Sequence, residues 1–398
     1  MKSLLRLFKS LPIQLILSIA LAFVLGNSLA LGTVQLFYTA SNCFIDLLLF
    51  ILPFMVFSLI YLASSNTEQK SLQLLILIFG GVFLSNFTAL FVAYFFSNWT
   101  LPLVGISEQF GQFTSAQSSV SPLFRWHLPT LISTDKAMLL AMIVGLVASR
   151  LSLKKAIDKA VSRLSHIINL LLNKFFIPLL PLYVFGFCLK LSYEEALPQL
   201  FSSYGKVFLL SMLLVAGYIF FLYFCGSGAN FRLALKSLRT MLPAGLTGFS
   251  TMSSAATMPI TIACTEKTTQ DADLTRLVIP TTSNIHMLGD DLTIVMCAMT
   301  LLTMFGHPTP DLASFALFAS AFCVAKLSCV GVPGASVLVV LPVLQSSLNF
   351  SPEMITVLTT IYILQDSFGT AANVLGNGAF TLLVQRLGRI TNRSAVAK

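Results

Sequence analysis

Charged residues are scarce in this chain. Asp, Glu, Lys and Arg make up only 10% of its 398 residues, whereas 56% are hydrophobic, and the mean hydropathy is +0.87. Soluble domains carry about 25% charged residues, so this composition excludes a soluble globular domain. The net charge of +9 therefore indicates orientation in a membrane and not an anionic partner such as nucleic acid.

Cysteines in paired or metal-binding arrangements are also missing. The seven cysteines are odd in number, scattered along the chain and mostly placed within apolar stretches. Their spacing matches neither a disulfide framework nor a metal site, so we expect them to act as small hydrophobic residues. No cofactor is predicted.

Long apolar runs dominate the first 226 residues. Most hold about 18 or more apolar residues, enough for a helix to cross a bilayer, and they are too long and too evenly apolar for barrel strands. We expect the basic and apolar start of the chain to be a retained first helix and not a signal peptide, because no clean cleavage site precedes a polar domain. The expected spans are 11–32, 42–64, 72–97, 136–150, 163–192 and 204–226.

The distribution of basic residues predicts the topology. We place the N-terminus inside and let two interrupted segments, 241–262 and 313–347, each enter and leave from one side. Then 18 of the 24 Lys and Arg residues fall on the inner side and four on the outer side, while Lys174 and Lys326 lie within apolar segments. Cytoplasmic loops favour Lys and Arg, so we expect cytoplasmic termini and an inner or plasma membrane location.

The two interrupted segments place prolines and small residues in the middle of apolar stretches. The first contains TGFSTMSSAATMPITI over 247–262, and the second contains SCVGVPGAS over 328–336. Such segments can turn back inside the membrane as re-entrant hairpins, where irregular backbone is tolerated if it is buried in protein or lines a wet cavity. A helix that packs tightly through small residues is the alternative.

A polar helix is expected after each hairpin, over 276–305 and 353–386. The second carries Asp366, Thr370, Asn373 and Asn377 on one helix face. A carboxylate at the bilayer centre costs about 2.5–3.5 kcal/mol on insertion scales, so it needs a partner, a cavity or a proton. A hydrogen-bond network between helices is the structural alternative to a binding site. We predict an all-α polytopic membrane protein with eight transmembrane helices and two re-entrant hairpins, arranged as inverted repeats around a midplane site.

Four motifs together resemble the dicarboxylate/amino acid:cation symporter family, which includes the glutamate transporters: STMSSAATMP, SNIHMLGDD, GVPGAS and QDSFGTAANVLGNG. The resemblance in segment layout spans nearly the whole chain. It implies a homotrimer that carries an amino acid with a cation by alternating access, and no enzymatic activity. It also implies that 1–64 and 136–226 are mainly scaffold, that 72–97 and 240–386 form the transport unit, and that 387–398 is a cytoplasmic tail.

The resemblance also assigns a substrate site. Asp366 matches the aspartate that holds the substrate ammonium, and Asn373 matches the asparagine that reaches the α-carboxylate. The implied substrate-binding residues are Ser253, Ser254 and Thr257 at the first hairpin tip, Val332, Pro333, Gly334 and Ala335 at the second tip, and Asp366, Gly369, Thr370 and Asn373 in the last helix.

Two departures from the family pattern bear on the substrate. Members with acidic substrates place an arginine where this chain has Gly369, and some supply one from the first hairpin, where this chain has Met252. A second buried carboxylate without a cationic partner is costly. We therefore favour a small neutral amino acid, with an acidic amino acid or a dicarboxylate as the alternative.

The expected ion sites depart further from the family. The Asn-Met-Asp-Gly motif is His286-Met287-Leu288-Gly289 here, and Asn377 replaces an aspartate. Two anionic ligands are thus missing, whereas the imidazole could carry a proton near neutral pH. Na+ is favoured as the coupling ion, with H+ as the alternative. The candidate cation-binding residues are Asn284, His286, Met287, Asp290, Asn373, Asn377, Ser328 and Cys329, with Asp291 added if the helix is locally unwound.

The sequence lacks the features of two other classes of membrane protein, intramembrane hydrolases and channels. Ser254, His286 and Asp366 supply the atoms of a hydrolytic triad, but no nucleophile-elbow motif surrounds the serine. A channel would need a filter-like carbonyl motif or a ring-forming acidic helix, and the sequence has neither. We therefore expect neither an intramembrane enzyme nor a channel.

Overall fold

The structure is a computed structural model that describes residues 11–26, 28–65, 72–106, 120–124, 126, 128, 132, 134–148, 154–194, 197–327, 329 and 334–396. These residues contain helices and no strand, which agrees with the predicted all-α class. In chain order the elements are α2 (Leu11–Leu25), α3 (Leu31–Ser65), α4 (Leu72–Leu103), α6 (Thr134–Ala148), α7 (Lys154–Leu171), η1 (Leu172–Phe176), α8 (Ile177–Tyr193), α9 (Leu197–Gly226), α10 (Phe231–Thr251), α11 (Ser254–Thr269), α12 (Ala272–Thr282), α13 (Leu288–Met304), α14 (Leu312–Lys326), α15 (Ala335–Leu348) and α16 (Pro352–Val396).

The outer surface of the helices is apolar over wide areas. Two helical stretches, Ile78–Leu103 and Tyr204–Gly226, are long and apolar enough to cross a membrane by length and composition. Large apolar side chains are also exposed on other helices, for example Val24 on α2 at 69% and Leu317 on α14 at 75%. Soluble monomers seldom expose such large apolar patches, so this surface suits lipid or a neighbouring subunit.

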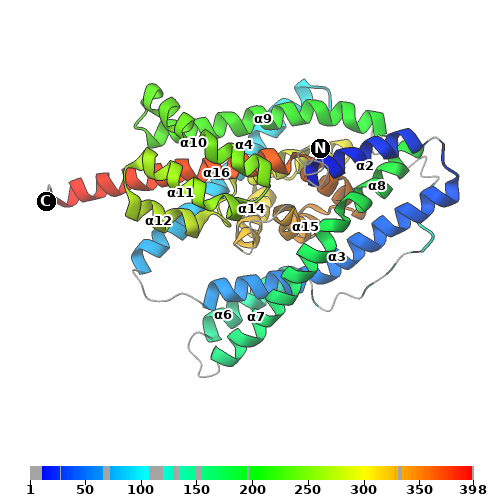
Figure 1. The fold of residues 1–398 in the computed structure, drawn as a ribbon, viewed down its shortest axis with the longest axis horizontal. Coiled ribbons are helices and arrows are strands. Elements are labelled where there is room, and N and C mark those ends of the chain that lie inside the picture. Colours follow the sequence, from blue (N-terminus) through cyan, green and yellow to red (C-terminus); the bar gives the residue numbers. More distant parts are fainter. Residues whose placement is uncertain are drawn as a thin grey trace, which may run out of the picture.

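The helices gather into two sets (Figure 1). Helices α2, α3, α6, α7 and α8 pack on one another, and α3, α6 and α7 extend away from the rest. Helices α4 and α9 to α16 form the second set, which α16 crosses. Helix α9 packs mainly on α16, α10 and α13, although the sequence analysis places it within the scaffold range 136–226.

The first interrupted segment forms a helix–turn–helix pair, α10 and α11, whose arms pack on each other. Met252 ends α10 with a positive φ of 52°, and Ser253 caps α11 by accepting a hydrogen bond from the Ala256 N–H at 3.2 Å. The arms extend beyond the predicted 241–262, from Phe231 to Thr269. The turn therefore lies near the middle of the pair.

The second interrupted segment gives a similar pair, α14 and α15, which also pack on each other. Its bounds, Leu312 to Leu348, are close to the predicted 313–347. Gly334 precedes α15 with φ of 74°, a left-handed conformation that glycine adopts without a Cβ penalty. Ser328, Val332 and Pro333 lie outside the described residues.

The predicted single helix over 276–305 is two helices, which corrects that expectation. Helix α12 ends at Thr282, α13 begins at Leu288, and the residues between them are not helical. Met287 gives α13 no side-chain cap. Instead, Asn373 Oδ1 on α16 accepts hydrogen bonds from the N–H groups of Gly289, at 2.9 Å, and Asp290, at 3.2 Å. The cap comes from a distant helix, so local sequence patterns did not reveal the break.

Helix α16 continues from Pro352 to Val396 and so includes most of the predicted tail over 387–398. Gln385 Nε2 donates to the carbonyl of Thr269 at 2.8 Å, and Arg386 Nη1 donates to the carbonyl of Cys225 at 2.7 Å. These bonds bring the ends of α9, α11 and α16 together at one end of the molecule.

Candidate functional site

Asp366 lies in the middle of α16 and contacts the second helix pair. Its Oδ2 accepts a hydrogen bond from the Gly334 N–H at 2.9 Å, and its Oδ1 accepts one from the Tyr362 hydroxyl at 3.2 Å. The residue is only 3% exposed. The structure thus brings together two of the predicted substrate-binding residues, Asp366 and Gly334, and adds Tyr362, which the sequence analysis missed.

The Asp366 carboxylate forms no ion pair with a protein cation among the described residues. The ion pairs of these residues all involve other carboxylates. An isolated carboxylate is costly to bury. The hydrogen bonds from Gly334 and Tyr362 compensate part of that cost. A ligand ammonium at this place would supply the missing positive charge.

Further along α16, Thr370 lies where the first helix pair approaches, whereas the side chain of Asn373 bonds to the start of α13. Thr370 and Asn373 are both buried. A Cβ added at Gly248 on α10 would lie 3.2 Å from the Thr370 carbonyl oxygen, so α10 approaches α16 closely there. Asn373 uses its Oδ1 to cap α13, and its amide N–H groups are the donors that suit a carboxylate.

The predicted residues at the first tip bond mainly to one another. Ser253 caps α11, and Thr257 Oγ1 donates to the Ser253 carbonyl at 2.8 Å. Thr257 Oγ1 also lies 3.0 Å from Thr251 Oγ1, and Ser254 is buried. These bonds fix the turn next to α16, on which α11 packs.

A buried charge cluster lies at the start of α13. Lys326 Nζ is 3.2 Å from Asp291 Oδ1 and 3.7 Å from Asp290 Oδ2, and all three side chains are buried. The Lys326 ammonium also donates to the hydroxyl of Ser336. The sequence analysis gave Lys326 no role, although a lysine in an apolar segment is rare enough to signal function.

Two glycines allow α13 and α16 to cross closely. A Cβ at Gly289 would lie 2.4 Å from the Gly369 carbonyl oxygen and 2.6 Å from the Ala372 Cβ. A Cβ at Gly369 would lie 2.6 Å from Asp290 Oδ1. The Asp290 carboxylate therefore occupies the space next to Gly369, where acidic-substrate members of the resembled family carry an arginine.

His286 sits in the non-helical stretch before α13 and is held by two helices. Its Nε2 lies 2.9 Å from Ser85 Oγ on α4, and its ring centroid lies 4.6 Å from that of Phe380 on α16. Asn377 Nδ2 donates to the His286 carbonyl at 3.3 Å, and Asn86 Nδ2 on α4 donates to the Ile285 carbonyl at 2.8 Å. Ser85 and Asn86 were not among the predicted site residues. Two adjacent polar residues within an apolar helix could have indicated them.

Some polar atoms here have no hydrogen-bond partner in the part of the chain that the structure describes. They are two amide oxygens, Asn86 Oδ1 and Asn377 Oδ1, and one ring nitrogen, His286 Nδ1. Amide oxygens are hard ligands that suit a small cation. Of the other cation-site candidates, Asn284 is half-buried, Cys329 is buried, and Met287 Sδ lies 3.9 Å from Lys326 Nζ.

The three residues that could form a hydrolytic triad do not assemble. His286 Nε2 faces Ser85, Asp366 bonds to Gly334 and Tyr362, and His286 Nδ1 has no partner among the described residues. A catalytic triad needs the serine within hydrogen-bond reach of the histidine, and the histidine within hydrogen-bond reach of the carboxylate. The geometry therefore offers no support for a hydrolase.

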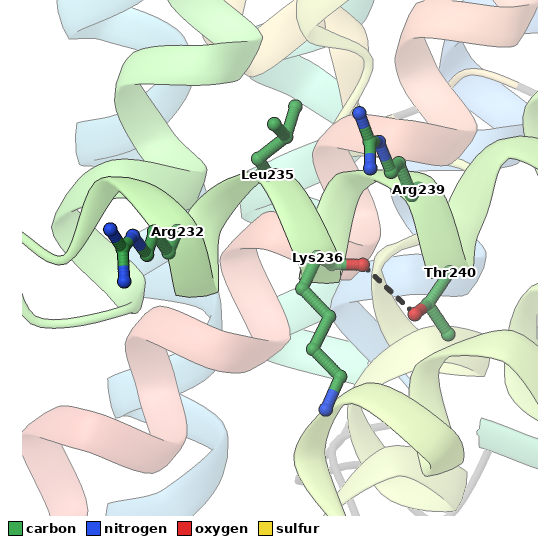
Figure 2. Close-up of a pocket in the computed structure, with 5 residues that line it drawn as sticks. All are labelled: Arg232, Leu235, Lys236, Arg239 and Thr240. Atoms are coloured by element: carbon green, nitrogen blue, oxygen red, sulfur yellow. Dashed lines mark hydrogen bonds between the residues drawn. The ribbon is translucent and has the colours of Figure 1, made fainter.

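A separate surface hollow lies on the exposed side of α10. Figure 2 shows its lining residues, with Thr240 Oγ1 donating to the Lys236 carbonyl at 2.9 Å. Three of the lining side chains are basic and lie on α10, the arm that leads to the first tip, and Asp366 is not among the lining residues. We do not assign the substrate to this hollow. Its lining residues are Arg232, Leu235, Lys236, Arg239 and Thr240.

Comparison with known proteins gives matches along nearly the whole chain. A family model described as "Sodium:dicarboxylate symporter family" matches residues 11–387. The serine/threonine transporter SstT of Acinetobacter baumannii strain AYE is 25% identical over 400 residues, covering 94% of this chain and 96% of the relative. Excitatory amino acid transporter 3 of Mus musculus is 32% identical over 172 residues, which covers 42% of this chain and 31% of the mouse protein.

Proposed function

The chain belongs to the sodium:dicarboxylate symporter family, and from this premise we propose that it carries a small neutral amino acid across the membrane. It is an integral membrane protein that performs cation-coupled symport of an amino acid. We propose Asp366 as the group that holds the substrate ammonium. The observation that carries this proposal is a buried carboxylate that forms no ion pair with a protein cation among the described residues.

Access to Asp366 requires movement of the second helix pair. The Gly334 N–H donates a hydrogen bond to Asp366 Oδ2, the oxygen atom that a substrate ammonium would also contact. Substrate entry therefore breaks this bond and moves the turn before α15 away from α16. The bond re-forms when the empty site closes, so α14 and α15 act as a gate.

A neutral substrate fits the surroundings of Gly369 better than an acidic one. The space beside Gly369 is filled by the Asp290 carboxylate, which would repel a second substrate carboxylate. The nearest buried cation, Lys326, is already paired with Asp290 and Asp291. Serine and threonine are the substrates in the name of the relative that matches over most of this chain.

An acidic amino acid or a dicarboxylate is the second candidate substrate. It is favoured by the family description and by the name of the mouse relative, an excitatory amino acid transporter. A carboxylate on the substrate side chain would then need Lys326 to leave its present partners. The structure gives no other buried basic side chain next to Asp366 among the described residues.

The charges at the site favour coupling to cations. With Asp290, Asp291 and Asp366 ionised, three carboxylates face one ammonium, that of Lys326. A zwitterionic substrate adds no net charge, so two negative charges remain to be balanced. We propose Na+ as the coupling ion, held in part by Asn377 Oδ1 near the non-helical stretch before α13. Proton coupling through His286 is the alternative.

The two sets of helices suggest which parts move. We propose that α4 and α9 to α16 form the transport unit and that α2, α3, α6, α7 and α8 form a trimeric scaffold. The two helix pairs are proposed to be re-entrant hairpins that enter from opposite sides. Basic residues on α10 gather at the end where α11 and α16 meet, which supports cytoplasmic termini by the positive-inside rule.

Uptake into proteoliposomes tests the function and the substrate together. We expect concentrative uptake of labelled serine, driven by an inward Na+ gradient and competed by threonine and alanine. Uptake of glutamate or aspartate without uptake of serine would contradict the neutral substrate. Uptake that is unchanged without sodium but follows an imposed pH gradient would reassign the coupling ion to H+.

The variant Asp366→Asn tests the proposed binding group. Removing one partner of a desolvated charge pair typically costs 2–5 kcal/mol, so we expect the concentration for half-maximal uptake to rise about 30-fold or more. Asp271→Asn is the control, because Asp271 caps α12 through Leu274 N–H at 3.1 Å, a role that asparagine also fills. Equal uptake by the two variants would remove Asp366 from the site.

A further inference from the structure

Lys326 is the last residue of α14, and its ammonium lies against the starts of two other helices, α13 and α15. Asp290 and Asp291 face it from the first turn of α13, Met287 from the residue before that helix, and Ser336 from the first turn of α15. The side chain of Lys326 has no exposed surface. This ammonium thus links the second helix pair to α13 deep inside the protein.

The ligands around this ammonium are those of a cation site. Two carboxylates and a hydroxyl supply oxygen atoms, and Met287 and Asp290 are among the residues that the sequence analysis assigns to the coupling ion. Apart from the ion pair of Asp291 Oδ1 with Lys326 at 3.2 Å, neither oxygen of Asp291 has a hydrogen-bond donor among the described residues, nor has Asp290 Oδ1. Among the described residues, the positive charge of Lys326 is therefore the main compensation for these two carboxylates.

We propose that the Lys326 ammonium takes the place of one coupling cation between the second helix pair and α13. This inference rests on the proposed function, because it concerns the number of cations that are transported with each substrate molecule. A mobile ion would enter and leave this place in each transport cycle. The lysine is tied to α14 and stays, so the chain needs one fewer cation from solution.

Charge counting gives the consequence for a variant. With Lys326 present, the carboxylates of Asp290, Asp291 and Asp366 exceed the ammonium by two charges. In Lys326→Met, which keeps a long apolar stem, the excess rises to three charges around a space lined by oxygen atoms. A small cation from solution then restores the balance, so the variant gains an ion site that the native chain lacks.

A merely structural ion pair would behave differently, and the chain contains a matched example. Lys190 on α8 is also buried, and its Nζ lies 3.8 Å from Glu194 Oε2 and over the ring of Tyr38. This pair involves one carboxylate and lies outside the site. Lys190→Met should lose stability without gaining a response to sodium, which makes it the control.

The experiment measures the unfolding midpoint of the purified full-length protein in detergent, with sodium chloride replaced stepwise by choline chloride at constant ionic strength. A ligand that binds only the folded state raises the midpoint with its concentration. We expect sodium to raise the midpoint of Lys326→Met by several degrees more than that of the native protein. We expect Lys190→Met to respond to sodium as the native protein does.

The double variant Lys326→Met with Asp291→Asn removes one charge of each sign. It should fold and respond to sodium no more than the native protein. The inference is overturned if Lys326→Met shows no extra response to sodium, or if it cannot be recovered even when sodium is present throughout purification. Because this readout needs no transport, a failure of native uptake would count against the proposed function and not against Lys326.

Discussion

Asn373 has two roles that can be separated by mutation. It is a proposed substrate ligand, and its Oδ1 caps α13 by accepting hydrogen bonds from the N–H groups of Gly289 and Asp290 at 2.9 and 3.2 Å. Asn373→Ala removes both roles. Asn230→Ala is the matched control, because Asn230 caps α10 through the Leu233 N–H at 3.1 Å on the exposed surface.

The structure sets the size of the two effects. In Asn230→Ala, water can hydrate the freed N–H, so the loss is that of an ordinary cap, about 0.5–2 kcal/mol. In Asn373→Ala, two buried N–H groups lose their acceptor, and each unsatisfied buried group costs about 1–3 kcal/mol. The expected loss of unfolding free energy is therefore about 2–6 kcal/mol. The start of α13 should also open, since no side chain of its own caps it.

Reversible unfolding in mixed micelles compares the two variants, and amide hydrogen exchange locates the change. We expect the amides of Gly289 and Asp290 to exchange faster in Asn373→Ala and unchanged in Asn230→Ala. Serine uptake should fall only in Asn373→Ala. If Asn373→Ala loses no more stability than Asn230→Ala, the account of how α13 begins is wrong.

Two further predictions concern the helix crossing and an exposed cap. Gly289→Ala should cost about 1–3 kcal/mol of unfolding free energy, because its Cβ would lie 2.4 Å from the backbone oxygen of Gly369. Gly217→Ala on α9 meets no atom within 4 Å and should gain about 0.5–1 kcal/mol instead, and equal effects in unfolding would refute the crossing. The hydrogen bond from the Ser314 N–H holds the pKa of the Asp311 carboxyl below its ordinary value. Stability from this carboxylate is present above its unfolded pKa, near 4, and is lost as the pH falls through the lower folded value. In Asp311→Asn, the unfolding midpoint should therefore decrease less with falling pH than in the native protein. An equal decrease in the two proteins would contradict this.

The placement of the polar groups of α16 on one helix could be predicted from the sequence, because it follows a local rule. One helix face carries Asp366, Thr370 and Asn373, and spacing alone reveals such a face. The two interrupted segments were also found from prolines and small residues, and the structure gives each a helix–turn–helix form. The family resemblance assigned both Gly334 and Asp366 to the substrate site, and the structure places them in hydrogen-bond contact.

Features that depend on distant partners were missed or misjudged. The start of α13 is capped by Asn373, a residue of α16, so the sequence suggested local unwinding near Asp291 but did not place the break. Lys326 was noted only as a basic residue in an apolar segment, since its partners on α13 become visible after folding. The contacts of Ser85 with His286 and of Asn86 with Ile285 likewise become visible only in the folded structure.

One packing feature connects the fold to the choice of substrate. Because Gly289 and Gly369 let α13 and α16 cross closely, the first turn of α13 carries the Asp290 carboxylate into the space beside residue 369. That carboxylate needs a cation, and Lys326 supplies it from α14. An arginine at residue 369 would have to displace Asp290 and compete with Lys326. The proposed neutral substrate and the proposed role of the Lys326 ammonium therefore both depend on the same helix crossing, and a change in one should require a change in the other.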